Sequence, residues 1–193
     1  NIVLQPKAEW GVIAGETTST GDLYKSYVAP LAAIGPVASF IGLSLIGASV
    51  PFLGTIRVPL LSGLSMAIVC FVMALVGVFV IALVINALAA NFGGEKDQAQ
   101  ALKAAAYSFT PAWLAGVLHL IPSLGVLVLL ASLYGVYLLY LGLPVLMKAP
   151  EDKALPYTVV VVVCAIVVGV LIGVVSGLFG GMGGAPYGMT GIH

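Results

Sequence analysis

The chain has 193 residues, of which 61% are apolar and 7% are charged, and its seven basic and seven acidic residues give a formal net charge of zero. A soluble domain carries about a quarter charged residues and about half apolar ones. This composition excludes a water-soluble monomer. It also excludes disorder and nucleic-acid binding, because both need many charged residues. We therefore expect an all-α protein embedded in a lipid bilayer.

Five stretches of the chain are long and apolar enough to cross a membrane, which takes about 20 mostly apolar residues. They cover residues 27–50, 62–91, 104–121, 123–147 and 157–179, and none contains a charged residue. The charges lie in the ends and connections, as an apolar slab requires. The sequence predicts a polytopic transmembrane bundle of five helices.

The basic residues of the connections predict the orientation of the bundle. Six of them fall on one side of the five spans: Lys7, Lys25, Lys96, Lys103, Lys148 and Lys153. Only Arg57 falls on the other side. Because cytoplasmic connections are enriched in Lys and Arg, we expect the N-terminus in the cytoplasm and, after five spans, the C-terminus outside.

The chain divides into a cytoplasmic or interfacial segment (residues 1–26), a five-span membrane domain (27–180) and a glycine-rich extracytoplasmic tail (181–193). In the first segment, Pro6 begins a short helix with Trp10 and Ile13 on one face. Because Trp favours the membrane interface, we expect this helix to lie on the cytoplasmic membrane surface. Ser19 and Asp22 have the spacing of a helix N-terminus.

The fifth span contains small residues at every fourth position, which places them on one helix face. They are Ala165, Gly169, Gly173, Gly177 and Gly181. Small residues let the backbone of another helix approach closely, so this pattern predicts helix–helix packing. The partner is either another span of the same chain or a separate subunit, by self-association or with another membrane protein.

A second group of residues is polar and lies where the second span ends and the third begins. Its members are Asn86, Asn91, Tyr107, Ser108 and Thr110. Because they share one side of the membrane, they can meet at one depth. They either satisfy each other as structural contacts or line a pathway for a solute or ion. Kinks predicted at Pro36 and Pro111 accompany the second alternative.

The remaining polar residues do not form a catalytic or metal-binding set. Arg57 either extends to the lipid phosphates or contacts an anion or headgroup at the mouth of a cavity. His119 has no acidic partner in the sequence pattern, and Cys70 and Cys164 lie in apolar runs. The chain has no paired intramembrane carboxylate and no HExxH motif. We therefore predict that it is not an enzyme and binds no metal or cofactor.

Several short blocks of sequence, in this order, resemble the Yip1 family, and its short bacterial members in particular. The blocks are Pro6-Lys7-Ala8-Glu9-Trp10, Asp22-Leu23-Tyr24, Tyr27-Val28-Ala29-Pro30-Leu31, Phe92-Gly93-Gly94, Tyr107-Ser108-Phe109-Thr110-Pro111 and Leu138-Leu139-Tyr140-Leu141-Gly142-Leu143-Pro144. The resemblance implies a small integral protein of the bacterial cytoplasmic membrane without catalytic residues.

In the eukaryotic members of this family, a long cytosolic N-terminal region binds small GTPases. The corresponding segment here has about 26 residues, so the resemblance does not extend to GTPase binding. Two functions are compatible with the sequence. The first is a non-enzymatic scaffold, accessory subunit or membrane organiser. The second is a permease or channel for a small solute, ion or lipid that uses the polar group between the second and third spans.

Overall fold

The computed structural model describes residues 1–50, 54–121, 124 and 126–182, and these are mostly helical. The α-helices are α1 (Pro6–Gly15), α2 (Thr20–Leu23), α3 (Ala29–Phe40), α4 (Leu60–Ala89), α5 (Gln98–Ala115), α6 (Val126–Leu146) and α7 (Glu151–Met182). Two π-helical segments, η1 (Tyr24–Val28) and η2 (Ile41–Ile46), flank α3. The 3-10 segments η3 (Ala90–Phe92) and η4 (Gly116–Leu120) follow α4 and α5.

The first long helix runs without a break through α2, η1, α3 and η2. Ser19 begins it, because its Oγ accepts a hydrogen bond from the backbone N–H of Asp22, as the spacing predicts. The helix ends at Gly47, whose φ of 92° turns the chain into strand β1 (Ala48–Val50). Residues 48–50, expected within the first span, therefore belong to a strand. This strand pairs antiparallel with β2 (Gly54–Ile56), an addition to the predicted all-α fold.

Four helices of the described chain are long and apolar enough to cross a membrane. They are Thr20–Ile46, Leu60–Phe92, Val126–Leu146 and Glu151–Gly177. They correspond to the first, second, fourth and fifth predicted spans. The third predicted span (104–121) corresponds to α5 and η4. α5 begins before the predicted apolar span, at the N-cap Asp97, so Lys103, counted with the connections, lies inside the helix.

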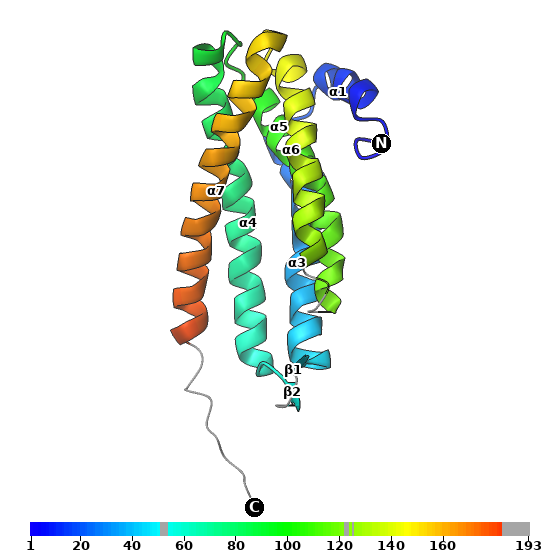
Figure 1. Ribbon diagram of the computed structural model, residues 1–193, viewed down its shortest axis with the longest axis vertical. Helices are drawn as coiled ribbons and strands as arrows, with labels where there is room; N and C mark the ends of the chain where they lie inside the picture. The colour runs from blue at the N-terminus through cyan, green and yellow to red at the C-terminus, as the bar shows by residue number, and fades with distance from the viewer. Residues whose placement is uncertain (51–53, 122–123, 125, 183–193) are drawn as a thin grey trace, which may run out of the picture.

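α5 lies in the middle of the bundle and α7 at its edge. α5 packs against α3, α4 and α6, and most residues from Ala101 to Pro111 are buried. α7 packs mainly along α4, as Figure 1 shows. Only 11% of the most apolar window of α7 is buried, against 28% in α4 and in α6. α5 therefore forms the core, and α7 exposes most of its surface.

The two ends of the bundle carry different elements (Figure 1). α1 lies at one end, together with the α4–α5 and α6–α7 connections. We call this the α1 end. Strands β1 and β2 lie at the opposite end, where α3 stops and α4 starts. We call this the hairpin end.

Candidate functional site

At the α1 end, helix α1 docks on the bundle through the face that carries Trp10. The Trp10 side chain is fully buried and lies edge-on to the ring of Tyr107, with ring centroids 6.2 Å apart. A Cβ atom at Gly142 of α6 would lie 2.7 Å from the Trp10 ring, so only glycine fits there. This face therefore packs on the bundle, because Gly142 leaves room for the indole, and the location of the helix at the cytoplasmic membrane surface stays a prediction.

Two polar side chains of α5 donate hydrogen bonds to backbone carbonyls at the C-terminal end of α1. Lys103 Nζ donates hydrogen bonds to the carbonyls of Ile13 at 2.9 Å and Glu16 at 2.6 Å. Gln100 Nε2 donates to the carbonyl of Ala14 at 3.1 Å. The last turn of a helix leaves its carbonyls without intrahelical hydrogen-bond donors. A cation at this end also interacts favourably with the negative end of the helix dipole. Lys103 is 2% exposed, so it acts as a buried cap rather than as a cytoplasmic surface charge.

The five polar residues predicted to meet at this end do not form one cluster. Tyr107 and Thr110 come together around Tyr27, whose ring lies 4.4 Å from that of Tyr107 and whose hydroxyl lies 2.7 Å from Thr110 Oγ1. Asn91 is exposed in η3. Asn86 is half-buried, and its Oδ1 has no hydrogen-bond partner in the described part of the chain. Within the part of the chain that the structure describes, no side-chain hydrogen bond joins the asparagines to the tyrosines.

Ser108, the fifth residue of the predicted polar group, faces α6 rather than Tyr107. A Cβ at Gly135 would lie 2.5 Å from the Ser108 carbonyl, so α5 and α6 approach most closely here. The Ser108 side chain is buried, without a hydrogen-bond partner among the described residues, beside a hollow of about 240 Å³. Its neighbours there include Gly135 and Val161.

The small-residue face of α7 makes no close contact with the other described helices. A Cβ added at Gly169, Gly173 or Gly177 would meet no atom within 4 Å. Ala165 is half-buried, and the side-chain position of Gly181 lies outside the described residues. α7 packs on α4 through other residues, such as Ile172, which reaches Gly77. Of the two partners left open by the sequence, another span of this chain does not cover the described glycines.

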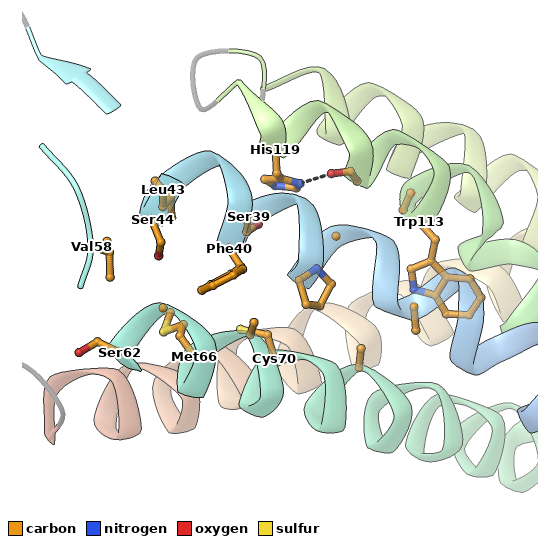
Figure 2. A pocket seen from close by; sticks show the side chains of 18 of the residues that line it. Ser39, Phe40, Leu43, Ser44, Val58, Ser62, Met66, Cys70, Trp113 and His119 are labelled. Carbon is orange, nitrogen blue, oxygen red and sulfur yellow. Dashed lines mark hydrogen bonds between the residues drawn. The ribbon is translucent and has the colours of Figure 1, made fainter. Parts of the chain in front are cut away.

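At the hairpin end, a cavity of about 690 Å³ separates α3 from α4 (Figure 2). Its walls are mostly apolar, and η4 and α5 close it on the third side with Trp113 and His119. Figure 2 shows Phe40 of α3 and Ser44 of η2 on the side of the cavity opposite Met66 and Cys70 of α4. The sequence does not reveal this cavity, because no spacing in α3 or α4 distinguishes its residues from ordinary lipid-facing ones.

Few polar groups line this cavity, and most of them lie toward its hairpin end. Ser44 is 7% exposed, and its hydroxyl has no hydrogen-bond partner in the described part of the chain. His119 uses Nδ1 in a 3.0 Å contact with the Gly116 carbonyl. Arg57 lies next to the lining residue Val58; it is exposed, and its Nε donates to the Ile46 carbonyl at 3.4 Å.

The comparison with protein families identifies the chain. The family model of the Yip1 domain matches residues 1–182. The chain belongs to the Yip1 family. This confirms the resemblance derived from the sequence, and the family blocks meet in the structure: Trp10, Tyr27, Tyr107 and Gly142 come from four of them and lie together at the α1 end.

Two curated relatives of this Yip1 family member share its length. The chain is 29% identical over 156 residues to the Escherichia coli strain K12 protein named "Inner membrane protein YohC", which covers 79% of this chain and 80% of that protein. The protein of the same name from E. coli O6:H1 aligns with the same values. No solved structure matches the chain.

The Phe92-Gly93-Gly94 block also has a structural explanation. Gly93 has a φ of 76°, and a Cβ at Gly94 would lie 2.6 Å from the carbonyl of Met147. Phe92 stacks on the buried ring of Tyr157 at 4.9 Å. In this Yip1 protein the block therefore packs the α4–α5 connection against the start of α7.

Proposed function

We propose that this Yip1 protein is a non-enzymatic scaffold or accessory subunit of the bacterial cytoplasmic membrane that binds a second membrane helix through α7. The open glycine face of α7 carries the proposal. Glycines at this spacing normally receive another backbone, and no described helix of this chain occupies the space beside Gly169, Gly173 and Gly177. The inner-membrane name of the E. coli relatives supports the location.

The proposal includes five membrane crossings, a cytoplasmic N-terminus and an external C-terminus. α5 is less apolar than the other four helices, but its neighbours α3, α4 and α6 shield it from lipid. A shielded helix does not need an apolar surface all round. The asymmetry of six lysines against Arg57 supports the orientation.

A reporter fusion tests the orientation separately from the partner. Alkaline phosphatase, which is active only outside the cytoplasm, is fused after His193 of the full chain, and green fluorescent protein is fused at the same place in a second strain. We expect an active phosphatase and a dark fluorescent fusion. The opposite pattern would refute five crossings with an internal N-terminus.

The partner is tested by widening α7 at the centre of its glycine face. Gly173→Leu places a bulky side chain in the proposed interface. Val174→Leu, on an exposed neighbouring position, is the matched control. In-membrane crosslinking of the full chain at native abundance should capture a second copy or another membrane protein. Gly173→Leu should reduce this capture at least about tenfold, and Val174→Leu should change it little. Equal capture by both variants would contradict the proposal.

A further inference from the structure

The cavity at the hairpin end has the length of one lipid tail. Its lining runs from Ala32 to Ser44 along α3 and η2, and from Ala74 to Ser62 on α4. At a rise of 1.5 Å per residue, each wall is about 18 Å long. The hydrocarbon core of a bilayer is about 30 Å thick, so the acyl chains of one leaflet reach about half that distance. The cavity therefore extends from one membrane surface to about the middle of the bilayer.

Missing side chains, rather than a gap between helices, create this cavity. Gly35, Ala67, Ala74 and Ala112 line it with little or no side chain. Leu43 and Met66 line it and are also exposed, 38% and 43%, so the cavity reaches the lipid-facing surface of the bundle. An apolar space of this kind does not hold ordered water. In a membrane, the available apolar molecule is a lipid tail.

The polar groups lie at the end where a headgroup would be. Ser44 is buried without a partner in the described part of the chain, and its hydroxyl can donate to an ester oxygen. Arg57, beside Val58, lies at the same end and carries the only positive charge predicted for this side of the membrane. A guanidinium pairs well with a phosphate.

We propose that the cavity between α3 and α4 binds one phospholipid of the adjacent leaflet. One acyl chain fills the cavity as far as Ala32 and Ala74, Ser44 donates to the ester region, and Arg57 contacts the phosphate. This site shares Gly177 with the α7 face, because Gly177 also lines the cavity, whereas Gly173 does not. The substitutions Gly173→Leu and Ala67→Phe therefore test the scaffold proposal and the lipid site separately.

The fluorescence of Trp113 can report the binding of this lipid, because Trp113 lines the cavity. The chain has two tryptophans, and the other, Trp10, is fully buried at the α1 end. Phosphatidylglycerol with a dibrominated acyl chain is added to the purified full chain in detergent, and tryptophan fluorescence is recorded. We expect quenching that saturates at about one lipid per chain. Trp113→Phe should abolish the saturating component, which assigns the quenching to the cavity.

A substitution that fills the cavity tests the lipid site most directly. Ala67→Phe places a ring among the lining residues, and Ala87→Phe places the same ring on an exposed position of the same helix. Ala67→Phe should weaken lipid binding at least about tenfold, and Ala87→Phe should leave it unchanged. Ala74→Leu gives a milder filling in case the first variant does not fold, with helicity measured by circular dichroism. Native mass spectrometry should find one retained phospholipid in the wild type and in Ala87→Phe.

The headgroup contact is tested with Arg57→Gln. It should weaken binding of the brominated phosphatidylglycerol about two- to fivefold without removing saturation, because an exposed ion pair contributes modestly. Unchanged binding would overturn the assignment of Arg57 to the phosphate. Quenching that never saturates, or that Ala67→Phe and Ala87→Phe alter equally, would overturn the lipid site. Retention of a second protein copy in place of lipid would overturn it too.

Discussion

The α1 end and the hairpin end of the bundle differ in how far protein atoms satisfy their polar groups. At the α1 end, Lys103 and Gln100 donate to backbone carbonyls of α1 and Tyr27 contacts Thr110, although Trp10 Nε1 has no partner among the described residues. At the hairpin end, the buried hydroxyl of Ser44 has no hydrogen-bond partner among the described residues and lies beside a mostly apolar cavity of about 690 Å³. The hollow at the α1 end is smaller, about 430 Å³, and has the charged Lys7 and Glu151 in its walls. Substitutions at the α1 end should therefore cost stability, whereas cavity variants should change binding.

The largest effect is expected from Trp10→Ala. It removes a fully buried ring from its place between Gly142 and Tyr107, and a change of this kind costs about 3–5 kcal/mol in a packed core. We expect a lower thermal midpoint in detergent and rapid proteolysis of the first 16 residues. Val12→Ala, on the exposed face of the same helix, is the control. Equal behaviour of the two variants would mean that α1 does not dock.

Lys103→Met should have the next largest effect. It keeps a long apolar side chain but removes the Lys103 donor from the carbonyl of Glu16 and leaves the carbonyl of Ile13 with only the 3.3 Å bond from the Glu16 N–H, at a cost of about 1–3 kcal/mol. Backbone hydrogen exchange in α1 should accelerate while exchange in α4 does not change. Lys7→Met, at an exposed position of α1, should leave both rates as they are. Faster exchange throughout the bundle would argue against a specific cap.

A pair of glycine substitutions compares the tightly packed helices with α7. A Cβ at Gly135 collides with the Ser108 carbonyl, so Gly135→Ala should cost about 1–2 kcal/mol in the detergent-solubilised monomer. Gly169 has open space around it, so Gly169→Ala should be neutral or stabilise the monomer by up to about 1 kcal/mol. Thermal midpoints measure both. A destabilising Gly169→Ala would show that α7 packs on its own chain.

The smallest effect concerns the exposed ion pair at the α1 end. Lys148 Nζ lies 2.7 Å from Glu95 Oε2, and this hydrogen bond and charge raise the pKa of Lys148 above its ordinary value of 10.5. The pair therefore stabilises the fold below pH 10.5, and the stabilisation is lost as the pH rises through the raised pKa. Glu95→Gln should lower the thermal midpoint slightly at neutral pH, and the difference should vanish in strong alkali. A difference that grows with pH would contradict this.

The sequence predicted the parts of the fold that one-dimensional patterns determine. Charge-free runs located the second and fourth spans to within three residues, whereas the first and fifth helices begin seven and six residues before the predicted spans. The Ser19 cap and the shared face of Trp10 and Ile13 are confirmed. The burial of α5 inside the bundle was not predictable from such patterns. Its partners lie on α3, α4 and α6, and at its N-terminal end on α1. From the sequence alone, Lys103 is therefore interpreted as a surface charge, because only the fold places Ile13 and Glu16 beside it.

In the candidate sites too, the sequence predicted local patterns but not which distant residues come into contact. Tyr107 and Thr110 meet, as their shared depth suggests, but through Tyr27 rather than through Asn86 or Asn91. The regular glycine spacing of α7 is the strongest packing pattern in the sequence, yet the close approaches within the chain use isolated glycines such as Gly135 and Gly142. A single glycine leaves no pattern, because only the opposing helix shows why it is needed.

The π-helical segments beside α3 have a consequence for how this protein can change in evolution. A π turn holds one residue more than the α turn it replaces. Deleting one residue within Tyr24–Val28 can therefore convert the turn to α-helix and leave the residues on both sides facing their present neighbours. The same deletion inside Ala29–Phe40 would rotate everything beyond it by about 100°. Length differences among homologues should accordingly concentrate in η1 and η2 and be absent from α3.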